Sequence, residues 1–358
     1  MRIVILANST SGLYQFRREL LMELVKTKDV VCSVPEIDKY SKKIESIGCK
    51  IVKTKMNRRG VNPIGDVYLL LQYIYLFKKY KPDLVFSYTI KCNIYGGIAG
   101  QIFKIPYIAN ITGLGTSIEN DGILRLISLS MYKVGLRRAR CVFFQNESNL
   151  KLFKSKRVLN CQAKIIPGSG VNLSTYKYET YPLDGRIFKF LFIGRIMKDK
   201  GIEELLHAVE KLIDDGEKVF LDIVGRCDDS YYSLLKENEK KGYVKYHGEQ
   251  ESVREFYSAT QCVVLPSYHE GMANVLLEAA ATGRPVIATC VPGCEETFDE
   301  GVTGLGCKAR DVKSLKNAMK KMCLMTRCER ERMGKLGRER MERIFDRNIV
   351  VRAYMDEI

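Results

Sequence analysis

The sequence has few residues that could hold a metal ion. It contains three histidines, His207, His247 and His269, and its 12 cysteines form no C-x-x-C pair. Because structural zinc sites take their ligands from closely spaced cysteines and histidines, the sequence predicts no metal site and no cofactor. Cysteines in apolar runs, such as Cys141 and Cys262, behave as small hydrophobic residues, and so many free thiols fit a reducing cytosol.

Long apolar segments are also missing. No run of about 18 apolar residues exists, and the longest candidate, residues 64–77, is interrupted by Asp66 and Gln72. The chain leads directly into Ile3–Ala7, an apolar stretch too short for the core of a secretory signal and typical of a buried strand. We therefore expect a cytoplasmic protein with no membrane-spanning helix.

Acidic residues are scarce in the first half. The net charge is +16, and residues 1–180 hold 29 basic and 12 acidic residues, whereas the rest of the chain is close to neutral. General solubility is one explanation; an anionic partner, namely nucleic acid, a lipid surface or a phosphorylated substrate, is the other. Because the tyrosines do not alternate with a stripe of basic residues and no nucleic-acid motif is present, a nucleic-acid-binding protein is only the alternative from another class.

Apolar runs alternate with amphipathic segments along the first half, and this alternation predicts a parallel sheet with helices on both faces. The expected strands are 2–7, 30–34, 50–54, 83–87, 107–111 and 141–144. The expected helices are 13–27, 39–47, 65–80, 92–103, 124–139 and 147–154. Residues 169–186 are rich in Gly, Ser, Tyr and Pro, lack periodicity and read as a linker.

The second half repeats this pattern. The expected strands are 189–193, 219–224, 244–247, 262–265 and 286–289. The expected helices are 202–214, 231–240, 253–259, 274–283, 311–321 and 329–344. We therefore expect two α/β domains, residues 1–168 and 187–344, with a C-terminal helix at about 345–358 that packs back onto the first domain.

The segment 266–289, PSYHEGMANVLLEAAATGRPVIAT, predicts a loop, a helix, a tight turn and a buried strand. Glu270 lies in the loop and Glu278 in the first turns of the helix. Acidic residues near the start of a helix also complement the helix dipole, so these two glutamates alone do not distinguish a binding site from a structural role. The N–H groups at the helix start suit a phosphate, which leaves sugar hydroxyls for the carboxylates.

The pattern S-x-x-E-G-x-x-x-x-x-L-E-A-x-A-x-G-x-P-V-I-A in this segment resembles the nucleotide-sugar site of the family-4 glycosyltransferases. These are retaining enzymes of the GT-B fold, in which two Rossmann-like, doubly wound domains face each other across a central cleft. The resemblance spans most of the chain. It implies an N-terminal acceptor-binding domain and a C-terminal nucleotide-sugar-binding domain.

By this resemblance Arg195 and Lys200 grip the diphosphate of the donor, where fixed cations would stabilise the charge that builds up on the leaving group. Glu270 positions the sugar, and Glu278 binds the ribose hydroxyls. His269, beside Glu270, is expected to pack in the loop rather than act as a base. The other expected donor-binding residues are Gly194, Gly271, Met272, Asn274, Val275, Leu276 and Arg226.

In the first half, Ser9-Thr10-Ser11-Gly12 follows the first strand, and Gly12 is an expected substrate-binding residue. It forms no G-x-G-x-x-G motif, which argues against a dinucleotide site. The run 87–97 resembles the T-x-K-x-N-x-x-G signature of transferases that build bacterial surface polysaccharides on a polyprenyl-diphosphate carrier. Residues 58–63 and 110–115 fit the same subgroup. Many family members carry a histidine in the latter loop, whereas this chain offers the backbone of Gly113.

The segment 123–140, ILRLISLSMYKVGLRRAR, combines an apolar face with five basic residues. Such a helix can lie in a membrane interface, and it can equally pack on a sheet. Together with the charge of the first half, it suggests an enzyme that is peripheral on the inner face of the cytoplasmic membrane and docks on anionic lipid.

The sequence thus predicts a retaining hexosyl- or N-acetylhexosaminyl-transferase of the capsule type. It would move a sugar from a nucleotide-diphosphate donor, most plausibly UDP-linked, to a lipid-linked polyprenyl-diphosphate glycan in polysaccharide biosynthesis. A nucleotide-sugar epimerase or hydrolase on the same fold is the enzymatic alternative.

Overall fold

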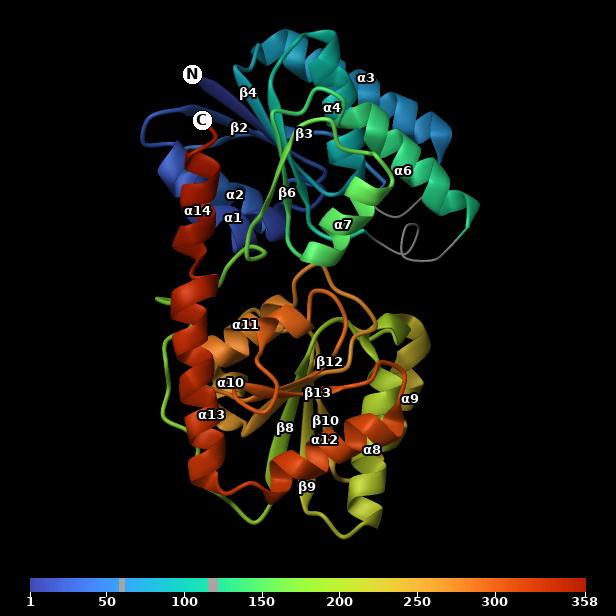
Figure 1. The fold of residues 1–358 in the computed structure, drawn as a ribbon, viewed down its shortest axis with the longest axis vertical. Helices are drawn as coiled ribbons and strands as arrows, with labels where there is room; N and C mark the ends of the chain where they lie inside the picture. The colour runs from blue at the N-terminus through green and yellow to red at the C-terminus, as the bar shows by residue number, and fades with distance from the viewer. Residues whose placement is uncertain (58–61, 115–121) are drawn as a thin grey trace. The chain divides into compact units, whose positions relative to one another are not determined.

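The computed structural model describes residues 1–57, 62–114 and 122–358. These residues form two compact units, Met1–Ser169 with Arg347–Ile358, and Gly170–Asp346 (Figure 1). Each unit is a parallel sheet with helices on both faces, as the alternating apolar and amphipathic segments predict.

The described part of the first unit contains a seven-stranded sheet in the order β3-β2-β1-β4-β5-β6-β7. Its strands are β1 (Arg2–Leu6), β2 (Asp29–Val34), β3 (Lys50–Lys53), β4 (Leu84–Tyr88), β5 (Tyr107–Ile111), β6 (Cys141–Phe144) and β7 (Gln162–Ile165). The sequence analysis did not predict β7. Its residues QAKI carry little apolar pattern because the strand lies at the sheet edge and is partly exposed.

Helices cover both faces of this sheet (Figure 1). They are α1 (Thr10–Leu24), α2 (Lys39–Ile47), α3 (Pro63–Tyr80), α4 (Ile90–Ile102), α6 (Ile123–Gly135), α7 (Glu147–Ser155) and α14 (Arg347–Met355). α3, α4 and α6 bury their apolar sides in one core, and α1, α2 and α14 bury theirs in the other. α3 and α6 both pack against α4.

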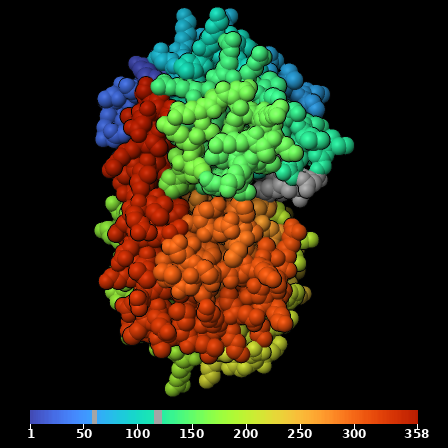
Figure 2. Space-filling model, viewed as in Figure 1, coloured from blue at the N-terminus to red at the C-terminus, as the bar shows by residue number. Residues whose placement is uncertain are grey.

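The C-terminal helix α14 belongs to the first unit. Tyr354 is 1% exposed, packs on Phe86 and Phe143 of the sheet, and is joined to Asn110 by a hydrogen bond of 2.5 Å between the amide nitrogen and the phenolic oxygen. Arg347 forms an ion pair with Glu19 of α1 at 2.9 Å. In Figure 2 the red C-terminal residues lie beside the blue residues of the N-terminal part.

The described second unit contains a six-stranded sheet in the order β10-β9-β8-β11-β12-β13. Its strands are β8 (Phe188–Ile193), β9 (Val219–Val224), β10 (Val244–Tyr246), β11 (Cys262–Leu265), β12 (Val286–Thr289) and β13 (Gly304–Cys307). Its helices are α8 (Ile202–Asp214), α9 (Tyr232–Lys240), α10 (Arg254–Ala259), α11 (Asn274–Ala281), α12 (Val312–Leu324) and α13 (Arg327–Arg340), with 3-10 turns η1 (Lys198–Lys200), η2 (Asp229–Tyr231) and η3 (Glu295–Thr297) and a π-helical turn (Met341–Phe345). The edge strand β13 was not predicted, because its sequence GLGC contains two glycines.

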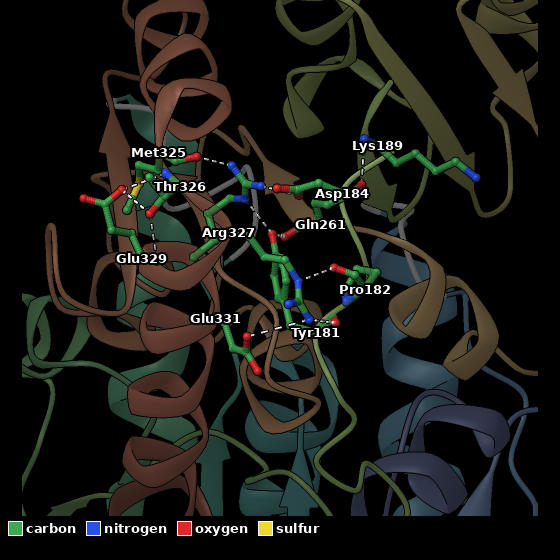
Figure 3. A network of polar contacts seen from close by, with 11 residues as sticks. Tyr181, Pro182, Asp184, Lys189, Gln261, Met325, Thr326, Arg327, Glu329 and Glu331 are labelled. Carbon is green, nitrogen blue, oxygen red and sulfur yellow. Dashed lines mark hydrogen bonds and ion pairs between the residues drawn. The ribbon is translucent and has the colours of Figure 1, made fainter. Parts of the chain in front are cut away.

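Residues 170–186, which lie in the segment 169–186 that the sequence analysis treats as a linker, belong to the second unit (Figure 3). Tyr181 is 2% exposed, and its hydroxyl donates to the carbonyl of Gln261 at 2.9 Å. Arg327 donates to the carbonyls of Tyr181 and Pro182. Arg284, 1% exposed, donates to four backbone carbonyls of other segments, at Glu179, Thr180, Tyr257 and Ser258. Arginine side chains therefore fix a segment that has no secondary structure of its own.

Candidate active site

The candidate donor-site residues lie where the strand order of the second sheet reverses. From β8 the chain moves outward to β9 and β10, and it then returns to β11 on the other side of β8. Parallel α/β sheets bind ligands at the carboxyl ends of the strands beside such a reversal. Lys200 follows β8, and Glu270 follows β11, so the topology brings them together from positions 70 residues apart.

Lys200 and Glu270 are in direct contact in this loop pair. The ammonium group of Lys200 donates to Glu270 Oε1, and the hydroxyl of Ser267 donates to the same oxygen at 2.8 Å. The two side chains are 24% and 15% exposed. Both side chains are thus mostly shielded from water but not completely buried. The partial shielding strengthens the attraction between the two charges. The ammonium carries three N–H groups and can donate to further acceptors.

Two glycines allow the loops around this ion pair to approach closely. Gly201 has a φ of +67°, and a Cβ atom there would lie 2.1 Å from the carbonyl oxygen of Pro266. Gly293 has a φ of +85°, and a Cβ atom there would lie 2.3 Å from the carbonyl oxygen of Glu270. Side chains at either position would push the loop that carries Glu270 away from its neighbour.

His269 lies next to Glu270 but contacts another part of the site. Its Nε2 is 3.8 Å from a carboxylate oxygen of Asp199, and the N–H of Tyr268 donates to the carbonyl of Asp199 at 2.9 Å. These contacts attach the loop after β11 to the 3-10 turn that presents Lys200. The packing role that the sequence analysis gave to His269 stays a prediction.

Glu278 is held by a tyrosine that the sequence analysis did not identify. The hydroxyl of Tyr257 donates to Glu278 Oε2 at 2.9 Å, and Tyr257 is completely buried. Burial, followed by the nearby Glu278 charge, raises the pKa of the Tyr257 phenol well above its ordinary value. The phenol therefore stays a proton donor and fixes one carboxylate oxygen. A tyrosine in a short helical segment gives no sequence signal for such a contact.

The residues around the start of α11 are ordered by backbone hydrogen bonds. The N–H of Asn274 donates to the carbonyl of Met272 at 3.0 Å, and that of Leu276 donates to the carbonyl of Ala273 at 2.9 Å. Met272 is 7% exposed, while Gly271 and Val275 are partly exposed. The N–H groups at the helix start, those of Asn274, Val275 and Leu276, are thus not equivalent as phosphate ligands, since those of Asn274 and Leu276 already have a backbone acceptor.

Glycines also shape the loops after β8 and β9. Gly225 has a φ of +137°, and a Cβ atom there would lie 2.0 Å from the carbonyl oxygen of Gly194. Arg195 and Arg226 follow these glycines and are exposed. Arg195 Nη1 lies 3.9 Å from the sulfur of Met197. The structure therefore places Arg195 near the carboxyl end of β8 without joining it to the Lys200–Glu270 pair.

In the first unit, the strand order reverses between β1 and β4. Gly12 lies in the first turn of α1, not in a loop before the helix, and its N–H donates to Ser9 Oγ at 3.1 Å. Gly113, with a φ of +142°, follows β5. Residues 58–61 and Gly115, part of the predicted subgroup motifs, lie outside the described residues.

The T-x-K-x-N-x-x-G signature has several structural roles. Asn93 is fully buried, accepts from Ser87 Oγ at 2.8 Å and donates to the carbonyl of Asn110 at 2.9 Å. A Cβ atom on Gly96, the glycine of the signature, would lie 2.3 Å from Leu6 Cδ1, so this glycine allows α4 to pack on β1. A Cβ atom on the next residue, Gly97, would lie 2.3 Å from the carbonyl oxygen of Gly135 in α6. Asn93 thus joins α4 to β5, and the two glycines let α4 pack closely on β1 and α6.

The described residues contain no group of three or more His, Cys, Asp or Glu side chains arranged to hold a metal ion. Within the same ranges, no helix has the length and apolar character required to cross a bilayer.

Comparisons with known proteins match both halves of the chain. A family model described as "Glycosyl transferase 4-like" matches residues 2–146, and one described as "Glycosyl transferases group 1" matches residues 187–324.

Two curated relatives match nearly the whole chain. The chain is 28% identical to the N,N'-diacetylbacillosaminyl-diphospho-undecaprenol alpha-1,3-N-acetylgalactosaminyltransferase of Campylobacter jejuni, with 99% of this chain and 97% of the relative covered. It is 27% identical to the capsular polysaccharide biosynthesis glycosyltransferase CapM of Staphylococcus aureus, over 92% and 90% of the two chains. A solved structure of Anabaena HepE in complex with UDP-glucose superposes with a TM-score of 0.80 at 16% identity, covering 100% of both chains, which supports the GT-B fold.

Proposed function

Since the chain belongs to the glycosyltransferases of the GT4/GT1 type, we propose that it transfers a hexose or N-acetylhexosamine from a UDP-sugar to a polyprenyl-diphosphate-linked glycan, with retention of configuration. The observation that carries the proposal is the contact between Lys200 and Glu270 at the strand-order reversal of the second sheet. A cation for a diphosphate and a carboxylate for sugar hydroxyls are thereby adjacent.

In the proposed reaction the bond between the anomeric carbon and the diphosphate oxygen breaks, and the acceptor hydroxyl oxygen bonds to the same face of that carbon. Negative charge develops on the leaving diphosphate, where Lys200 and Arg195 stabilise the transition state more than the bound donor. The departing phosphate oxygen takes the proton of the acceptor hydroxyl. The side chains of this protein thus stabilise the charge of the leaving group and orient the donor, and none of them needs to act as the base.

Glu270 and Glu278 are assigned to orientation of the donor. Glu270 positions the sugar with the Gly271 N–H, while Glu278, fixed through one oxygen by Tyr257, binds the ribose hydroxyls through the other. The start of α11, from Met272 to Leu276, and the loops with Gly194 and Arg226 complete the donor site. Orientation of this kind holds the anomeric carbon so that the acceptor hydroxyl can approach it from the face that the diphosphate leaves.

The first unit is assigned to the acceptor, with Gly12 in the first turn of α1, after β1, and Gly113 in the loop after β5. The names of the relatives in Campylobacter jejuni and Staphylococcus aureus support a lipid-linked acceptor and capsule-type polysaccharide assembly. We place the enzyme on the inner face of the cytoplasmic membrane. α6 supports this placement, since Leu124 and Leu126 are 56% and 61% exposed beside Arg125.

The experiment that tests the function supplies a panel of UDP-sugars with and without a polyprenyl-diphosphate-linked disaccharide acceptor. Extension of the acceptor by one sugar, with release of UDP and an α-linkage from an α-donor, is the expected result. Epimerised or hydrolysed donor at the same rate without any acceptor would instead assign the chain to the epimerases or hydrolases. An inverted linkage would contradict the retaining mechanism alone.

A further inference from the structure

Helix α3 is apolar on two opposite sides, and only one of them is buried. Leu69, Tyr73, Leu76 and Phe77 enter the core of the first unit. Five apolar residues on the other side are exposed: Ile64 by 83%, Val67 by 58%, Tyr68 by 52%, Leu71 by 56% and Tyr75 by 64%. At 3.6 residues per turn these five fall within an arc of about 100°, which we call the outer stripe.

Acidic charge is turned away from the outer stripe. Asp66 is the one acid in the α3 sequence, and it pairs with Lys91 of α4 at 2.5 Å and accepts from the hydroxyl of Tyr95 at 3.1 Å. Lys78 and Lys79 occupy the last turn of α3. The stripe is therefore an apolar surface with lysines at one end. In a bilayer interface the apolar side chains would meet the acyl chains and the lysines would reach the headgroups.

A groove of about 370 Å³ runs along this helix, between α3 and the edge strand β3. It is lined by Val52, Lys53, Thr54, Tyr68, Leu71, Gln72, Tyr75, Leu76, Lys79 and Tyr80, among which there is no acidic residue. Near one end, the ammonium groups of Lys50 and Lys79 lie 5.2 Å and 5.7 Å from the centre of the Tyr80 ring. The groove thus combines apolar and aromatic walls with positive charge.

Hydrogen bonds fix the segment after β3, which forms one wall of the groove. Gln72 accepts from the N–H of Lys55 at 2.9 Å and donates to its carbonyl at 3.0 Å, so the segment after β3 is attached to α3. Thr54 is joined to Ser33 of β2 by a hydrogen bond of 2.7 Å between their hydroxyls. A preformed groove can accept a chain without a large cost of ordering its own residues.

We propose that the outer stripe of α3 lies in the membrane interface and that the groove binds one anionic phospholipid, with its acyl chain along Leu71 and Tyr75 and its phosphate beside Lys53 and Lys79. The inference rests on the membrane attachment proposed above and deepens it, because it names the helix and the lipid. The charge of the groove selects an anionic over a neutral headgroup.

The sequence contains no tryptophan, which provides a direct test. Leu71→Trp places the one tryptophan of the variant on the outer stripe. Leu126→Trp and Leu324→Trp, at positions 61% and 70% exposed, place it on α6 and on the second unit. The probes are vesicles of phosphatidylcholine, alone or mixed with phosphatidylglycerol or with polyprenyl phosphate. We expect a blue shift and quenching by brominated lipid for Leu71→Trp with the phosphatidylglycerol vesicles, and no change for Leu324→Trp.

The lipid contacts are tested by flotation of charge variants of the otherwise unchanged chain. Leu71→Glu should weaken binding to phosphatidylglycerol vesicles by at least about tenfold, since it removes apolar burial, whereas Leu324→Glu should not. Lys53→Gln with Lys79→Gln should lower it by about 30-fold, roughly fivefold for each lysine near the surface. Circular dichroism and thermal unfolding establish that each variant is folded.

Three results would overturn the proposal: an unshifted Leu71→Trp emission with anionic vesicles, a shift that requires polyprenyl phosphate, or unchanged flotation of folded Leu71→Glu. Transfer to a short-chain, water-soluble acceptor separates this inference from the proposed function. The charge variants should keep the wild-type rate on that acceptor, whereas failure of the wild type itself would count against the proposed function and leave the lipid data interpretable.

Discussion

Replacement of Lys200 by methionine removes the ammonium group next to Glu270 and keeps a side chain of similar length. If the ammonium stabilises the leaving diphosphate, its loss should lower kcat by about 10²- to 10³-fold, or about 2.7–4 kcal/mol, the usual cost of removing one preorganised donor. The donor KM should change much less, because the interaction strengthens as charge develops in the transition state.

The same change should cost only modest stability. Glu270 would lose its cation but keep the hydroxyl of Ser267, and its side chain is 15% exposed. A hydrogen bond to a charged group contributes about 1.5–3 kcal/mol, and partial exposure lowers this to about 1 kcal/mol. For a unit of this size we expect Tm to fall by about 2–4 °C.

The assay is the initial rate of UDP release with the lipid-linked acceptor, alongside thermal unfolding. Lys198→Met is the matched control, since Lys198 is an exposed lysine in the same 3-10 turn. The double variant with Glu270→Gln should lose less than the sum of the single losses, because the two groups are in contact. A kcat within about threefold of wild type, or equal to that of Lys198→Met, would refute the role of Lys200.

Three further predictions concern the second unit. Tyr257→Phe removes the hydroxyl that donates to Glu278 and should raise the KM for the nucleotide sugar about fivefold (about 1 kcal/mol), with little change in kcat. The same substitution should have no such effect when Glu278 is already replaced by Gln. Equal effects in both backgrounds would contradict the role of Tyr257 in positioning Glu278. Gly201→Ala should lower Tm by several degrees, because the positive φ costs alanine about 1–2 kcal/mol and the alanine Cβ also clashes with Pro266. Gly216 has a positive φ but open space around it, so Gly216→Ala should show the cost of the backbone strain alone. Burial raises the pKa of Glu296, so above the ordinary pKa of a carboxyl the folded state binds more protons than the unfolded state and loses stability as pH rises. Glu296→Gln should therefore flatten the fall in Tm as pH rises above the ordinary pKa of the carboxyl, and an identical pH profile would count against it.

The sequence predicted most of the strands and helices because buried strands and amphipathic helices differ in hydrophobic period. It missed β7 and β13, both at sheet edges, where exposure or glycine weakens the apolar pattern. It predicted a linker at residues 169–186 but not the buried contacts of Tyr181 with Gln261 and Arg330, because these join residues far apart in the chain. Local pattern carries no information on such pairs.

For the site, the motif with Glu270 and Glu278 was visible in the sequence together with Lys200, but their geometry was not. The contact of Lys200 with Glu270 follows from the strand order, which places β8 beside β11. The contact between Tyr257 and Glu278 could not be predicted, because the hydrogen-bond partner of a buried phenol is set by the tertiary structure and not by the residues next to it in sequence.

The amino-acid sequence by itself determined the two α/β halves, the glycosyltransferase motif and the excess of positive charge in the first half, because each is a local pattern or a sum over residues. The tertiary structure decided which charges meet, how close the glycine loops come, and which side of α3 faces solvent. Both sides of that helix are apolar in sequence, and packing against a sheet can bury only one of them.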